Sequence, residues 1–301
     1  MTMDSQQVPV GTAEAEIVHM RRGRGERSWR ALRKAPFTAW FGMIVVLAYI
    51  FVAVFAPLLA PYGESEVVGS AFELWGGQYL FGTDQLGRDV LTRLIFGARN
   101  TIGIAIVTTL LAFIIGGVLG ILVSIIRGWF DQLVSRGVDV LMAIPSLIFA
   151  LMLLSIFGPS TQNIILIIAV LDSTRVFRLT RAVAMNVAVM DYVEAARLRG
   201  ERLGWIMGRE ILPNILPPLV AEFGLRFCFV FLTISALSFL GLGIQPPTAD
   251  WGSMVRENAT LITYGKITPL LPAGAIALLT VAVNFVVDWF LHKTSGLRDD
   301  G

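Results

Sequence analysis

The chain has 301 residues, of which 55% are hydrophobic and 15% are charged, and its formal net charge is +2. This composition is typical of a polytopic membrane protein and excludes an ordinary soluble enzyme. Cys228 is the one cysteine and His19 and His292 are the two histidines, so an internal disulfide, a cysteine or histidine metal cluster and a Ser-His-Asp catalyst are also excluded.

The first 36 residues form a polar arm that ends in the basic stretch MRRGRGERSWRALRK. We predict that this arm lies on the membrane surface, because anionic lipid attracts Lys and Arg. A nucleic-acid partner is the weaker alternative, since an apolar run follows the arm directly, and we expect no such partner.

Six apolar runs follow, near residues 37–60, 101–126, 138–158, 163–181, 223–244 and 269–290. Each approaches or exceeds the roughly 20 residues with which a helix crosses a bilayer. The first run is too long for the core of a signal peptide, so we interpret it as a retained helix. In the second run, Gly116 and Gly120 predict close helix packing, and in the fifth Cys228 is expected to be a small core residue. The sequence therefore predicts an all-α membrane protein with about six transmembrane helices.

The predicted organisation has four parts. They are a cytoplasmic arm (1–36), a first transmembrane helix with an external loop (37–100), a core of five transmembrane helices with a cytoplasmic loop at about 182–222 (101–290), and a cytoplasmic tail (291–301). The sidedness follows from the basic residues, because membrane proteins keep Lys and Arg in the cytoplasm. Of the 24 Lys and Arg residues, 19 lie on the side of the termini, and the others are Arg88, Arg93, Arg99, Arg256 and Lys266.

The fourth run contains charged residues near its expected midpoint. The nine residues before Asp172 rise about 13 Å, roughly half of the ~30 Å hydrocarbon core. Arg175 lies one helical turn further on and can pair with Asp172. Because polar groups at this depth usually face protein or water, Asp172, Ser173 and Arg175 are candidate residues of a transport pathway. The alternative is a tilted or short span, which would place the pair in the cytoplasmic vestibule or against a partner subunit.

A charged segment, EAARLRGERLGWIMGREILP, then interrupts the apolar pattern. Asp191 and Glu194 have the spacing of a capping box, which predicts a helix near residues 192–200. Gly200 predicts a left-handed end to this helix. A second helix is predicted at 203–213, where its final proline would stop it.

This segment resembles the signature loop of the permease subunits of binding-protein-dependent ABC importers. That loop has Glu-Ala-Ala, three residues, Gly, nine residues and an apolar-x-Leu-Pro close. The matching residues here are Glu194, Ala195, Ala196, Gly200, Leu212 and Pro213. The resemblance implies that they form coupling helices that dock into a separate ATPase. Glu210 departs from the pattern, which has an apolar residue there. The alternative is an ordinary amphipathic loop on the inner membrane surface.

Three further stretches resemble the second permease of the peptide, nickel and glutathione importers. They are FGTDQLGRDVLTRLIFGAR (81–99), the run 128–146 and SFLGLGIQPPTADWG (238–252). The tail differs, because the Gly-Asp-x-Leu-Arg-Asp close of the family has only a displaced counterpart at Gly296-Leu297-Arg298-Asp299.

The resemblance implies one half of a transmembrane pore that imports short peptides by alternating access. The implied partners are a second permease, two ATPase subunits, an external substrate-binding protein and the lipid bilayer of the cytoplasmic membrane. The lysines Lys34, Lys266 and Lys293 stand outside any phosphate-binding loop, so we expect no cofactor, metal or catalytic residue in this chain, and ATP and Mg in the ATPase subunits.

Other functions remain open. Nickel and glutathione importers share the motifs of the peptide branch. An ion-coupled secondary transporter is a rival from a different class, with Asp172, Asp139 or Glu222 as the proton or cation site, although no inverted repeat is evident. A membrane scaffold without a transport role is the third alternative.

Overall fold

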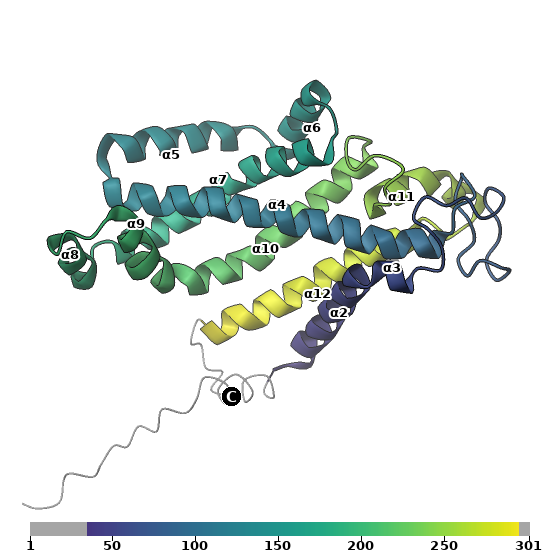
Figure 1. Cartoon of the computed structure of the whole chain (residues 1–301), viewed down its shortest axis with the longest axis horizontal. Coiled ribbons are helices and arrows are strands. Elements are labelled where there is room, and N and C mark those ends of the chain that lie inside the picture. The colour runs from purple at the N-terminus through teal and green to yellow at the C-terminus, as the bar shows by residue number, and fades with distance from the viewer. Residues whose placement is uncertain (1–34, 295–301) are drawn as a thin grey trace, which may run out of the picture. The chain divides into compact units, whose positions relative to one another are not determined.

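The computed structural model describes residues 35–294, which form helices and connecting loops (Figure 1). The elements are α2 (Phe37–Val54), α3 (Ala56–Leu59), α4 (Val90–Ile126), α5 (Gly128–Ala143), α6 (Ser146–Phe157), α7 (Thr161–Val187), α8 (Asp191–Leu198), α9 (Leu203–Trp205), η1 (Ile206–Ile211), α10 (Leu212–Phe239), α11 (Trp251–Asn258), η2 (Ala259–Tyr264) and α12 (Leu270–Thr294). Residues 35–294 contain no β-strand, only two isolated bridges, so the predicted all-α class is confirmed. The predicted surface arm, His19 and the tail motif at 296–299 fall outside the described residues.

Four of the described helical segments are long and apolar enough to cross a membrane: α2, α4, Leu203–Phe239 and α12. The bent pair α5 and α6 makes a fifth if it counts as one span. α7 has 27 residues, but charged side chains occupy its second half. The polytopic membrane class is therefore confirmed, and the fourth predicted span is a long helix that is apolar only in its first half.

The third predicted span, at 138–158, is wrong as a single helix. α5 and α6 meet at an angle of 89°, and Pro145 lies at the break. The ring of a proline disfavours helical backbone in the preceding residue. Ile144 accordingly has an extended backbone, with φ −92° and ψ 131°. Figure 1 shows α6 turned away from the direction of α5.

The predicted end of the second loop helix at Pro213 is also wrong. η1 is a π-helical turn, in which the Leu212 N–H donates to the carbonyl of Met207, five residues back. Pro213 directly follows this π-helical turn as the second residue of α10 and does not end the helix. α9, η1 and α10 form one helical segment of 37 residues, Leu203–Phe239, with a length of about 55 Å.

α4 and α7 approach each other closely at the two predicted glycines. A Cβ added at Gly120 would lie 2.7 Å from the Cβ of Thr180, and one added at Gly116 would meet the backbone of Ser173. Neither position can carry a side chain without moving α7. The predicted close packing is therefore confirmed.

Two of the three buried apolar clusters in residues 35–294 join most of the helices. One includes Phe231, Trp251 and Cys228, and joins α4, α6, α7, α10, α11 and α12. The other includes Ile121 and Ile215 and joins α4, α7, α8, η1 and α10. α8 and α11 lie at opposite ends of the helices in Figure 1, so the two clusters hold different ends of the helices together. Cys228 is the small buried residue that was predicted.

Candidate functional site

α8 ends in a Schellman motif at Gly200. The Gly200 N–H donates to the Arg197 carbonyl at 2.9 Å, and the Glu201 N–H donates to the Ala196 carbonyl at 3.2 Å. Gly200 has a φ of +78°, in the left-handed region where a side chain costs roughly 1–2 kcal/mol. The predicted left-handed helix end is confirmed.

The predicted capping box at the start of α8 is wrong. Met190 occupies the cap position and makes no side-chain bond to the helix. Asp191 is instead the first helical residue, where its charge is favourable next to the exposed N–H groups of the helix start. Glu194 reaches forward to Arg197, at 3.7 Å between Oε2 and Nη1, and not back to the cap.

α8 has one buried face and one exposed face. Val193 and Ala196 are fully buried and belong to the same apolar cluster as Ile206 and Ile211 of η1. The small side chain of Ala196 lets α8 lie close to η1. The opposite face is open, and Leu198 on it is 82% exposed. α8 is thus attached to the start of the 37-residue helical segment and presents its outer side.

Arg199 connects the end of α8 to η1. Its guanidinium lies 3.9 Å from the Glu210 carboxylate and 5.9 Å from the centre of the Trp205 ring. Glu210, the residue that departs from the family pattern, therefore has a partner within the loop. Sequence reasoning missed this pair, although a polar residue at an otherwise apolar position was the signal for it.

The remaining predicted coupling residues lie on the outside. We define the loop surface as the exposed residues Glu194, Ala195, Leu198, Gly200, Leu203, Leu212 and Pro213. Of the predicted coupling residues, Ala196 alone is buried, as a contact between α8 and η1. The loop surface contains Gly200, whose left-handed backbone would be strained by any side chain. It also contains exposed leucines that a protein partner could cover.

The charged residues of α7 form a cluster with α10. Asp172 Oδ1 lies 3.1 Å from Arg175 Nη1 and 3.7 Å from Arg226 Nη1. Arg226 also pairs with Glu222 at 2.7 Å, and its guanidinium lies over the Phe229 ring. This α7–α10 charge cluster, Asp172, Arg175, Glu222 and Arg226, balances two positive with two negative charges. The predicted pair of Asp172 and Arg175 is present, whereas the two partners on α10 were not foreseen.

The three candidate pathway residues differ in exposure. Asp172 and Ser173 are buried, and the Ser173 hydroxyl donates to the Val170 carbonyl of its own helix at 2.7 Å. The side chain of Arg175 is 42% exposed. A small cavity of about 20 Å³ is lined by Asp172 and Arg175 together with residues of α6 and α10, and it holds about one water molecule. Arg175 is therefore the member of this trio that a passing molecule could reach.

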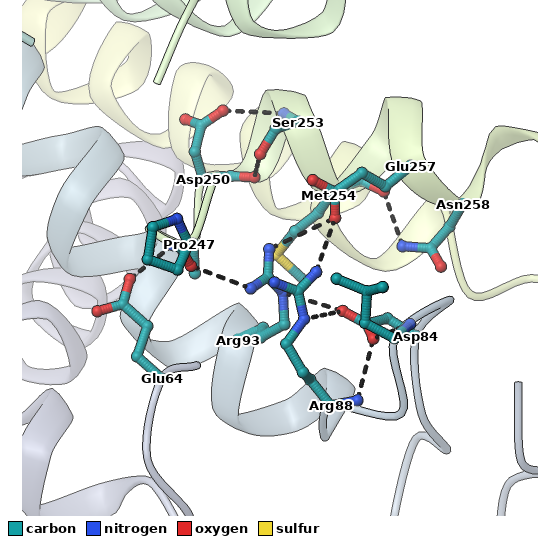
Figure 2. A network of polar contacts seen from close by, with 12 residues as sticks. Glu64, Asp84, Arg88, Arg93, Pro247, Asp250, Ser253, Met254, Glu257 and Asn258 are labelled. Atoms are coloured by element: carbon teal, nitrogen blue, oxygen red, sulfur yellow. Dashed lines mark hydrogen bonds and ion pairs between the residues drawn. The ribbon is translucent and has the colours of Figure 1, made fainter. Parts of the chain in front are cut away.

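A second charge cluster ties the loop before α4 to α11 (Figure 2). Arg88 Nε lies 2.7 Å from Asp84 Oδ2, and Arg88 Nη2 lies 3.2 Å from Glu257 Oε2. Arg93 pairs with the same two carboxylates, at 3.3 and 3.4 Å. All four side chains of this Asp84 cluster are at most 6% exposed. A buried group of this kind is stable only when every charge keeps its partner.

Hydrogen bonds around the Asp84 cluster join the same segments. Arg93 Nη1 donates to the Pro247 carbonyl at 3.4 Å, and Asn100 Nδ2 donates to the Glu64 carboxylate at 2.8 Å. Asp250 caps α11 by accepting from the Ser253 N–H and also accepts from Thr101. Burial raises the pKa of the Asp250 carboxyl above its ordinary value, and these hydrogen bonds act against the shift. The sequence stretches 81–99 and 238–252 thus lie side by side and are joined by hydrogen bonds.

Residues 116–293 match the family described as binding-protein-dependent transport system inner membrane component. This match begins within α4, includes the loop surface and continues into α12. The chain belongs to this family of ABC importer permeases. Residues 24–71 match the N-terminal TM domain of oligopeptide transport permease C.

The permease is similar over most of its length to curated bacterial proteins. It is 37% identical over 265 residues to the di/tripeptide transport system permease protein DppC of Pseudomonas aeruginosa, covering 86% of this chain and 85% of that protein. It is 34% identical over 264 residues to the dipeptide transport system permease protein DppC of Alkalihalophilus pseudofirmus, covering 86% and 83%. With the protein of the same name from Haemophilus influenzae, identity is 34% over 268 residues, covering 87% and 88%.

Proposed function

We propose that this permease imports short peptides across the cytoplasmic membrane by alternating access, driven by ATP that separate subunits hydrolyse. The observation that carries the proposal is the loop surface, where α8 is held against η1 and leaves its outer side open. The curated relatives are named for dipeptide or di/tripeptide transport, which supports a peptide cargo. Nickel or glutathione is the alternative cargo within the same branch.

The proposed assembly contains a second, similar permease, two ATPase subunits and an external substrate-binding protein. The exposed leucines of the loop surface, Leu198 and Leu203, suit an apolar cleft in one ATPase subunit. ATP and Mg belong to the ATPase subunits, and this chain needs no cofactor, metal or nucleic acid. Both termini and the loop surface lie in the cytoplasm in this proposal, because most Lys and Arg residues fall on that side.

The 37-residue segment Leu203–Phe239 provides the mechanical connection. Val193 and Ala196 attach α8 to η1, so a push on α8 moves the start of this segment. Its far end leads into the stretch that carries Pro247 and α11, which contact Arg88 and Arg93. Closure of the ATPases would therefore reposition the external side through one continuous helical segment.

Arg175 is the residue we propose to line the path, with Asp172 and Ser173 behind it. The cavity of about 20 Å³ beside the α7–α10 charge cluster is far too small for a peptide. We infer that the second permease completes the pathway on the exposed side of Arg175. An ion-coupled carrier is less well supported, since Asp172 and Glu222 are both paired with arginine and Asp139 is exposed.

The purified single chain is expected to hydrolyse no ATP, whereas the complete complex in vesicles should import peptide when ATP and loaded binding protein are supplied. The two measurements are phosphate release and uptake of a labelled dipeptide, each with ion gradients dissipated. Turnover by the single chain of roughly 1 per second or more, or uptake that requires an ion gradient and not ATP, would refute the proposal.

Thiol labelling tests the sidedness. In a Cys228→Ser background, Tyr264→Cys is expected to react with an impermeant reagent in intact cells without an outer barrier, and Leu198→Cys to react only after the membrane is opened. Tyr264 is 77% exposed and Leu198 is 82% exposed, so local burial would not cause a difference between them. Labelling of Leu198→Cys from outside would contradict the orientation.

A further inference from the structure

An apolar cavity of about 310 Å³ lies between α2, α4, α10 and α12. All four helices belong to segments that can cross a membrane. The lining is aliphatic and aromatic, and the one hydroxyl in it, on Tyr49, donates to the Ala275 carbonyl at 3.2 Å. Residues from each helix that line the cavity include Ile50, Ile106, Val220, Val283 and Trp289.

The cavity opens sideways. Ile50 is 44% exposed, Ile106 is 37% exposed and Val220 is 50% exposed, and each comes from a different helix. Because all four helices belong to segments that can cross a membrane, lipid hydrocarbon is the medium expected outside these side chains. Water would need two to four polar partners to occupy the space, and the lining has no charged group and offers only the Tyr49 hydroxyl, which is already bonded, and the indole N–H of Trp289. The lining therefore suits an apolar occupant, and the bilayer supplies one.

The volume distinguishes an acyl chain from a helix of another protein. A helix with a diameter of about 10 Å fills roughly 420 Å³ in each turn of 5.4 Å, which exceeds the cavity. A stretch of one acyl chain is narrow enough to enter. The cavity volume of about 310 Å³ corresponds to the volume of about ten groups the size of a water molecule, at roughly 30 Å³ each.

One end of the cavity has the composition of a membrane interface. α2 and α12 are antiparallel, since Phe41 packs against Phe285 while Tyr49 bonds to Ala275, so the start of α2 adjoins the end of α12. Trp289 lines the cavity near this end.

Lys293 provides a positive charge at the same end. The Lys293 ammonium lies 5.3 Å from the centre of the Trp289 ring, and a Trp with a Lys is typical of the headgroup level. In the sequence, Lys34 stands three residues before Phe37, the first residue of α2, and Asp288 stands five residues before Lys293.

We propose that this cavity binds one acyl chain of an anionic phospholipid, with the headgroup at the level of Lys293. The chain fills the space between the α2–α12 pair and the helices α4 and α10, which Figure 1 shows on one side of that pair. The proposal depends on the membrane class of the protein and not on its cargo. It assigns a structural lipid to the subunit itself.

The test is the lipid retained by the complete complex, purified in mild detergent from membranes that contain phosphatidylglycerol and phosphatidylethanolamine. Mass spectrometry of the extracted lipid is expected to find at least one phosphatidylglycerol per chain after washing. Ala221→Phe fills the cavity from α10 and should lower this amount at least fivefold, as should Val283→Phe from α12. Lys293→Gln should keep a bound lipid and lower the preference for phosphatidylglycerol at least threefold.

Val118→Phe is the matched control, because Val118 lies on α4 outside the cavity and is 51% exposed. It should retain lipid as the original chain does. Only variants with unchanged assembly on gel filtration are compared, and the two filling variants enter from different helices in case one fails to assemble. Equal retention by an assembled filling variant would overturn the proposal. So would an absence of headgroup preference, or crosslinking of Ile50→Cys or Val220→Cys to the second permease.

Discussion

Replacement of Gly200 by valine is expected to lower cargo-stimulated ATP hydrolysis by roughly 5- to 150-fold, the range of coupling free energies between 1 and 3 kcal/mol. Gly200 has a φ of +78° and closes α8 through the Schellman bonds. A β-branched residue there must either hold a strained backbone or extend α8. Both outcomes move the loop surface relative to the ATPase, while helix packing near α11 stays unchanged.

Gly204→Val is the control for this variant. Gly204 is exposed, lies in α9 with an ordinary φ, and has open space where the new Cβ would be placed. Arg199→Lys is unsuitable as a control, because Arg199 contacts Glu210 and Trp205. Gly200→Asn should fall between glycine and valine, since asparagine tolerates the left-handed region. Uptake and ATP hydrolysis are measured in reconstituted membranes at equal assembly. Equal losses in Gly200→Val and Gly204→Val would mean that added bulk, and not backbone strain, is responsible.

Asp84→Asn is expected to lower the free energy of unfolding by about 3–5 kcal/mol. Asp84 accepts from Arg88 and Arg93 and from two backbone N–H groups, and it is 1% exposed. An asparagine leaves two buried guanidinium groups with the single carboxylate of Glu257. Denaturant titration of the purified complex in detergent measures the change, and binding-protein-stimulated ATP hydrolysis should fall with it because the loop before α4 is released from α11.

The double variant Asp84→Asn with Arg88→Gln restores neutrality and leaves the Arg93–Glu257 pair, which is 3.4 Å apart. It should be less destabilised than the sum of the two single variants by at least about 1 kcal/mol. Glu66→Gln changes an exposed acid in the same loop and should cost less than about 0.5 kcal/mol. Strict additivity of the two cluster variants would contradict the proposed charge balance.

Local chemistry explains which parts of the loop were predictable. The small alanines and the glycine stop indicate a short helix near residues 192–200, and α8 with Gly200 matches that expectation. The predicted stop at Pro213 is wrong because the π-helical turn η1 leads directly into α10. No residue preference in this segment indicates such a turn. The break at Pro145 was readable from the rule for residues before proline, but the apolar run concealed it.

Long-range pairs set the limit of the sequence analysis. The partners Arg88 and Glu257 are separated by 169 positions, and in the sequence the charge of Arg88 served only to assign sidedness. The same holds for Arg226, whose contact with Asp172 depends on how α10 crosses α7. Periodicity indicates that helices exist and which residues are apolar, whereas the partner of a buried charge follows from the packing of whole helices.

The continuous segment Leu203–Phe239 has a thermodynamic consequence. It begins at the loop surface and leads to the stretch that contacts Arg88 and Arg93. If docking of a partner at one end of this segment changes the affinity of the other end for its own partner by a given factor, then docking at that other end changes the affinity of the first end by the same factor. Nucleotide-bound ATPase should therefore tighten binding of the external protein as much as that protein tightens nucleotide binding. One titration with nucleotide and one with the external protein, from opposite sides of the membrane, should give the same coupling factor.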